Sequence, residues 1–180
     1  MRDKRYRGTG RNIVAGLSKL DELAEAVKTK PCHAMIGDVV GSEVGGSVHC
    51  GLCGARSTTP PYLYTLQHGS VINTDDPVFK VLWMMCGGHP TSNSTDLHPE
   101  SSACKGTGYV RRSLNESAML LPGALRKSGR HVSISDTFLG FEAWVSNVTP
   151  HKYPAPMSRG EGVEWEEALA AAELDRRSHE

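Results

Sequence analysis

The feature that most constrains this chain is a pair of cysteines two residues apart, Cys50 and Cys53. They belong to a set of five cysteines in 180 residues, an odd number. We find no secretory signal, because the basic N-terminus leads into an amphipathic stretch and not into an uninterrupted apolar one. Cysteines in such a chain are typical of metal ligands rather than of disulfides. We therefore expect a metal-binding protein in a reducing compartment, the cytoplasm or, alternatively, a virion.

Glycine follows each cysteine of this pair, in His49-Cys50-Gly51-Leu52-Cys53-Gly54. Glycine lets the backbone fold under a cation, so that both thiolates turn onto it. In this respect the segment resembles the zinc knuckles of zinc-ribbon domains, and the resemblance implies a Zn²⁺ ion. The second half of a tetrahedral site must come from elsewhere in the chain. Cys86-Gly87-Gly88-His89 has the same spacing, with an imidazole in the last position, and would complete a Cys3His set.

Cys104 competes with His89 and Cys86 for this second half. The segment 101–108 resembles one turn of the cysteine-rich zinc hairpin of J-protein co-chaperones, whose unit is Cys-x2-Cys-x-Gly-x-Gly. Cys104, Gly106 and Gly108 match that unit, whereas a serine stands where its first cysteine should be. The resemblance covers one turn and implies no chaperone activity, but it indicates that Cys104 faces a metal. We therefore expect a site of Cys50, Cys53 and two of Cys86, His89 and Cys104.

The other cysteine and histidines are weaker candidates. Cys32 we interpret as a small apolar residue of the core, since free cysteine is often buried. A second site using Cys32, His33 or His98 is the alternative. The remaining histidines are scattered singly and are interpreted as surface or hydrogen-bonded residues.

Enzymatic roles are less favoured than a structural one. Four protein ligands close a zinc site, whereas catalysis keeps one position open for water. His98-Pro99-Glu100 fits the His-x-Glu of zinc deaminases, but the Pro-Cys-x2-Cys that should follow is missing. A thiol redox role needs Cys50 and Cys53 at the start of a helix, which Pro60 and Pro61 disfavour. We expect no enzyme, with zinc hydrolase, deaminase and thiol redox activity as minor alternatives.

Composition and periodicity predict a small α+β protein. Hydrophobic residues make up 38% of the chain and aromatic residues 6%, so the core is thin and a metal would help to stabilise it. Nineteen glycines and ten prolines favour a loop-rich fold. Apolar spacing predicts an amphipathic helix over 12–28 and composition a terminal helix over 163–177. Strands are predicted at 62–67, 78–85, 132–135 and 138–148.

These elements suggest three regions. Residues 1–30 are expected to form a basic segment and the amphipathic helix, and residues 31–150 a zinc-stabilised β-rich domain. Residues 151–180 are expected to form a linker rich in proline and glycine and an acidic C-terminal helix.

Charge points to the partners. The formal net charge is zero, which excludes a global field that would drive binding to nucleic acid or membrane, and no apolar run approaches the ~20 residues that span a bilayer. Residues 1–11 nevertheless carry five basic side chains against one acidic, a net +4, and residues 161–180 two basic against seven acidic, a net −5. We predict that the N-terminal segment binds nucleic acid by phosphate contacts and ring stacking. Its candidate residues are Arg2, Lys4, Arg5, Tyr6, Arg7 and Arg11. The alternative is a structural protein, such as a virion component, whose termini dock on neighbouring subunits in an oligomer or larger assembly.

Overall fold

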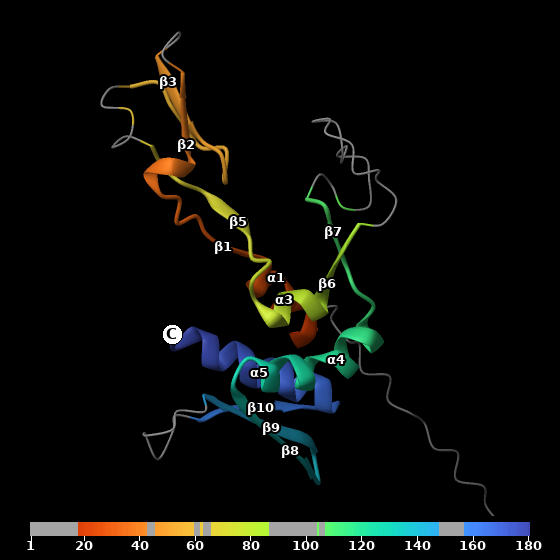
Figure 1. Ribbon diagram of the computed structural model, residues 1–180. Coiled ribbons are helices and arrows are strands. Elements are labelled where there is room, and N and C mark those ends of the chain that lie inside the picture. The colour runs from red at the N-terminus through yellow and green to blue at the C-terminus, as the bar shows by residue number, and fades with distance from the viewer. Residues whose placement is uncertain are drawn as a thin grey trace, which may run out of the picture.

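The computed structural model describes residues 18–42, 46–59, 62, 66–86, 104, 107–147 and 157–180 of the chain. The α+β class is confirmed (Figure 1). Helices lie on one face of a three-stranded sheet and form with it what we call the body. Two slender β-structures extend from the helices away from this sheet (Figure 1). One is the cysteine lobe, the described part of residues 29–72, and the other is a two-stranded ribbon.

The sheet of the body is antiparallel, in the order β10-β9-β8. Val132 of β8 pairs with Val145 of β9, and Ala143 of β9 pairs with Gly160 of β10. Alternation of apolar and polar residues buries Val132, Ala143 and Val145 against the helices. The strands are β8 (Arg130–Thr137), β9 (Gly140–Asn147) and β10 (Met157–Gly162).

The C-terminal helix α5 (Trp165–Ser178) packs on this sheet with almost no space between the backbones. A Cβ atom at Gly160 would lie 2.1 Å from the carbonyl oxygen of Ala168 and 2.3 Å from the nitrogen of Ala172. The glycines of this strand therefore serve close packing. The predicted proline- and glycine-rich linker is in this part a strand, because the short side chains let α5 approach β10.

Three further helices complete the body. Ser18 caps α1 (Lys19–Lys28) by accepting a hydrogen bond from the backbone nitrogen of Asp21, at 3.1 Å. The helix α3 (Pro77–Leu82) packs against both α1 and α4 (Leu114–Lys127). Their apolar faces meet α5 in a single buried cluster that includes Leu20, Leu23 and Phe79. The body therefore has a conventional hydrophobic core.

The segment predicted as one buried strand over Val78–Met85 is mostly helical, and that prediction was wrong. Asp76 caps the helix by accepting from the nitrogen of Val78 at 2.7 Å, and proline occupies the first helical position. Burial of Val78, Phe79 and Leu82 follows one helix face. Only the last three residues are extended. A short continuous apolar run does not distinguish a strand from a buried helix.

The cysteine lobe is built from very short strands. The pair β1 and β5 leads out from the body, and the three-stranded sheet β2-β3-β4 lies beyond it (Figure 1). A 3₁₀ turn, η1, joins β1 to β2. The bounds are β1 (Thr29–Pro31), η1 (Ile36–Asp38), β2 (Val39–Ser42), β3 (Ser47–Cys50), β4 (Arg56–Ser57) and β5 (Ser70–Ile72). The separate ribbon consists of β6 (Trp83–Met85) and β7 (Tyr109–Arg111).

The other predicted elements had mixed outcomes. The amphipathic helix is confirmed over Lys19–Lys28, while residues 12–17 lie outside the described residues. The strands near 132–135 and 138–148 correspond to β8 and β9, and the terminal helix to α5. Of the predicted strand 62–67 only Tyr62, Leu66 and Gln67 are described, and none lies in a strand. Among the described residues, no helix has the length and apolar character needed to cross a membrane.

Candidate metal centre

Four side chains of the cysteine lobe converge on one point: Cys32, Cys50, Cys53 and His68. Each offers one ligand atom, and these atoms all lie within 4.8 Å of one another. The cysteines are free thiols, two of them buried and Cys53 half-buried. Three sulfur ligands and one imidazole are the donor set of many structural zinc sites.

Two of the four ligands come from the ends of one strand pair. Pro31 of β1 lies opposite Ser70 of β5, and the ladder continues as Cys32 donates its backbone N–H to the carbonyl of Gly69, at 3.0 Å. Cys32 thus leaves β1 where His68 approaches β5. Residues 36 positions apart in the sequence are brought together by this short pairing.

The other two ligands come from the turn that follows β3. Cys50 donates its backbone N–H to the carbonyl of Ala55 at 2.8 Å, and Gly54 donates to the carbonyl of Cys50 at 2.9 Å. Gly54 has a φ of +71°, a left-handed conformation that glycine adopts without a steric penalty. The tight turn directs Cys50 and Cys53 to the same side, as the zinc-knuckle resemblance implies.

Two separations within the cluster match those around a tetrahedrally coordinated zinc ion. Two sulfurs at about 2.3 Å from Zn²⁺ are about 3.8 Å apart, and a sulfur and an imidazole nitrogen are about 3.6 Å apart. The sulfurs of Cys32 and Cys50 are 3.8 Å apart, and that of Cys53 is 3.5 Å from Nδ1 of His68. These distances exclude a disulfide between Cys32 and Cys50. The cluster is therefore preformed to within about an ångström of a metal site.

The local backbone already prepares one thiol for metal binding. Hydrogen bonding from the backbone of Ala55 lowers the pKa of Cys53 to about 6, and the backbone of Gly69 and the ring of His68 act in the same direction. Burial raises the pKa of Cys32 to about 11, although the backbone of Ala34 opposes this effect. Forming the buried thiolate of Cys32 is therefore unfavourable. A bound cation would compensate for this, because it stabilises the thiolate and releases the proton.

The predicted site residues are distributed over two places. Cys50 and Cys53 lie in the cluster, but its other two ligands are not the expected ones. Cys86 and Cys104 lie together at the end of the β6–β7 ribbon, where burial first, and then hydrogen bonding between their side chains, raises the pKa of Cys86. His89 lies outside the described residues, as do His98 and the N-terminal residues Arg2, Lys4, Arg5, Tyr6, Arg7 and Arg11.

The sequence did not reveal that Cys32 and His68 belong to the cluster. Cys32 was interpreted as a core filler; it is buried, but its sulfur belongs to the cluster. His33, the neighbour considered with it for a second site, is exposed and outside this cluster. His68 was one of the scattered histidines. In the sequence, His68 stands out only because it lies just before the short segment Ser70–Ile72, which forms β5. That position points to the cluster only once β5 is known to pair with β1.

Comparison with known proteins adds no relative. No protein-family model matches the chain, and neither a curated protein nor a solved structure matches it. The resemblances to zinc knuckles and to the J-protein hairpin therefore stay local, and the case for the metal centre is its geometry.

Proposed function

We propose that the cluster of Cys32, Cys50, Cys53 and His68 binds one Zn²⁺ ion as a structural centre. The tetrahedral spacing of three sulfurs and one imidazole nitrogen carries this proposal. Thiolate and imidazole ligands suit Zn²⁺ and disfavour Mg²⁺ and Ca²⁺, which bind oxygen. Four protein ligands leave no open position for water. On this basis the protein is not a zinc enzyme.

The zinc centre would stabilise a lobe that has little else to hold it. The strands of the lobe are two to four residues long, and its buried cluster consists of Cys32, Cys50 and Leu66. A metal that joins the two small sheets of such a lobe would contribute its binding free energy to folding. The role we propose is that of a non-enzymatic accessory protein, in which zinc shapes a surface for macromolecular recognition.

We propose nucleic acid as the partner, bound by the basic segment of residues 1–11. Its net charge of +4 supports phosphate contacts, and Tyr6 offers a ring for stacking. Arg56, Arg126 and Lys127 are exposed and add positive charge. Not every basic residue is available, since Arg111 donates to the carbonyl of Leu82 at 2.8 Å and so acts inside the body.

A role in assembly is the second candidate, and an exposed apolar surface favours it. Met119 and Leu120 on α4 are exposed in a hollow that α3 also lines. Met84 and Met85 of β6 are exposed in a second hollow that α3 lines as well. Flexible methionines at a surface are typical of protein-binding sites.

One experiment tests the metal and the partner on the same sample. Protein purified from reducing cells should contain about one zinc per chain by elemental analysis. It should bind single- or double-stranded nucleic acid with an affinity that falls with salt, and removal of residues 1–11 should weaken binding and flatten the salt dependence. Substoichiometric zinc with an intact lobe would contradict the metal centre. Unchanged binding after truncation would contradict the role of the segment, and a shift in sedimentation would favour assembly.

A further inference from the structure

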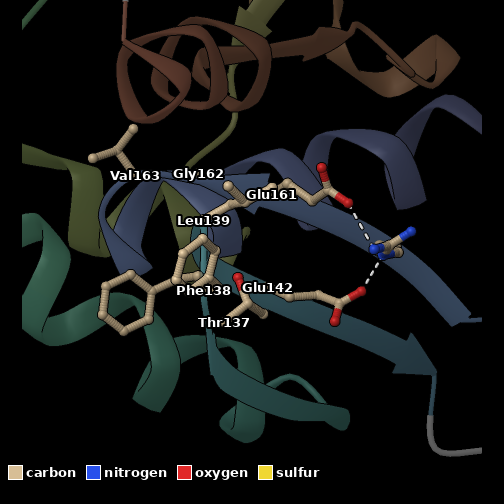
Figure 2. A pocket seen from close by; sticks show the side chains of 9 residues that line it. Thr137, Phe138, Leu139, Glu142, Glu161, Gly162 and Val163 are labelled. Carbon is tan, nitrogen blue, oxygen red and sulfur yellow. Dashed lines mark hydrogen bonds and ion pairs between the residues drawn. The ribbon is translucent and has the colours of Figure 1, made fainter.

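A pocket of about 500 Å³ lies at the β8–β9 turn (Figure 2). The sheet that carries this turn lies on the opposite side of the helices from the cysteine lobe (Figure 1). Phe138 and Leu139 of the turn and Val163, which precedes α5, form its apolar part. All three are exposed, Leu139 to 89%. Exposed apolar side chains around a hollow mark a binding surface.

The polar side of the pocket is acidic. Glu142 and Glu161 lie directly opposite each other on β9 and β10, an arrangement that is unfavourable for like charges. Arg159 binds both carboxylates, with Glu161 at 2.6 Å, and Figure 2 shows the two carboxylates reaching toward its guanidinium. Two carboxylates share one guanidinium, so one negative charge of the pocket remains uncompensated. The pocket thus suits a cationic occupant and disfavours phosphate groups and anionic lipids.

Its chemistry is that of a guanidinium site. Arg159 already shows the pattern, because its guanidinium lies 5.6 Å from the ring centroid of Trp144 while it binds carboxylates. Phe138 and Phe141, together with Glu161, offer the same combination of ring and carboxylate to a second arginine. An arginine-rich segment with apolar side-chain stems therefore fits this surface better than a purely apolar one.

Such a segment enters the described structure close by. The backbone nitrogen of Lys19 donates to Oε2 of Glu167 at 2.6 Å, which joins the start of α1 to the first turn of α5. Val163 of the pocket is four residues before Glu167. The seven residues 12–18 between this point and residues 1–11 span up to about 23 Å when extended.

We propose that the basic segment of residues 1–11 docks in this pocket of its own chain. Its arginines bind the free carboxylate charge and the rings, and Tyr6 contacts Phe138 and Leu139. A short tether gives an effective concentration near the millimolar range, so a weak site suffices. Since docking withholds the segment from phosphate groups, it regulates nucleic-acid binding; this consequence rests on the function proposed above.

The test uses a labelled peptide of residues 1–11 and a chain that lacks them, with binding followed by fluorescence anisotropy at several salt concentrations. The peptide should bind the truncated chain. Its affinity for the full chain should be lower by about tenfold or more, because the chain's own segment occupies the pocket. Phe138→Ser combined with Leu139→Ser should weaken binding to the truncated chain about tenfold, and Glu161→Lys should weaken it and flatten its salt dependence. Ile36→Ser, an exposed apolar residue of the cysteine lobe, is the matched control and should change nothing.

Equal binding to the full and truncated chains, or equal loss with Ile36→Ser, would overturn the proposal. So would a full chain that sediments as a dimer and loses dimerisation with Phe138→Ser and Leu139→Ser, because the occupant would then be a second copy. In the full chain the same pair of substitutions should strengthen nucleic-acid binding several-fold. If nucleic acid does not bind at all, the proposed function fails while the peptide result still decides the docking.

Discussion

The body and the cysteine lobe are stabilised by different means. In the body, helices α1, α3, α4 and α5 and the β8–β10 sheet share one buried apolar cluster of seventeen residues. In the lobe the corresponding cluster has three buried residues, and two of them are cysteines. Burial of apolar side chains drives folding in the first region, whereas the described part of the second has few buried side chains to offset the entropy of ordering its chain. This difference supports the proposal that a metal takes the place of a core in the lobe.

The largest expected effect is loss of the lobe when one of its ligands is removed. Cys50→Ser should abolish stoichiometric zinc and expose the amides of β2, β3 and β4 to hydrogen exchange, while those of α5 and β9 stay protected. Elemental analysis and exchange mass spectrometry measure the two parts. Cys86→Ser is the matched control and should retain both zinc and protection. If Cys86→Ser instead released the zinc, the ligands would be those expected from the sequence.

The next effect concerns a charge buried in the body. Glu173 is fully buried and accepts hydrogen bonds from Arg176 and Arg177, each at 2.8 Å, with Arg130 at 3.7 Å. Glu173→Gln should lower the free energy of unfolding of the body by about 3–5 kcal/mol, because the arginines lose their counterion. Urea titration measures this loss. Glu180→Gln, which removes an exposed partner of Arg176, should cost no more than about 1 kcal/mol. Zinc content should stay unchanged in both variants.

A smaller effect should follow from closing the gap between α5 and β10. Gly160→Ala places a methyl group within 2.3 Å of two backbone atoms of α5 and should destabilise the body by about 1–3 kcal/mol. Gly123→Ala in α4 should have the opposite effect, because nothing lies within 4 Å of the new Cβ atom. It should raise the free energy of unfolding of the body by about 0.5–1 kcal/mol. Thermal or urea unfolding separates the two signs. Equal effects would mean that close packing does not hold α5.

The smallest effect is at the start of α1. Ser18→Ala removes the acceptor for the backbone nitrogen of Asp21 and should cost about 1 kcal/mol. Hydrogen exchange should accelerate in the first turn of α1 and leave the lobe unaffected, although α1 leads directly into β1. Ser18→Asp should restore protection. Loss of zinc from Ser18→Ala would show that the two regions fold as one unit.

Local patterns in the sequence were sufficient for part of the structure. The spacing of Leu20, Ala24 and Val27 placed α1, and alternation placed β8 and β9. The helix α4 was not predicted, since Pro122 and Gly123 in its middle are helix breakers. The sequence predicts a linker where β10 lies, because Gly160 and Gly162 carry no β signal when their contact with α5 is unknown.

The metal centre divides in the same way. The sequence alone determined that Cys50 and Cys53 lie on the same side of one turn, because the four consecutive residues 50–53, with the glycine after each cysteine, close that turn by themselves. The tertiary structure decided that Cys32 and His68 join them in the cluster. It depends on the pairing of β1 with β5 across the long segment between them, and Cys86 and Cys104 are drawn instead to the ribbon of β6 and β7. The spacing of the two cysteines within one turn is a local property of the sequence. Which distant residues meet them is set by strand register, and no pattern within one segment encodes its register with another segment.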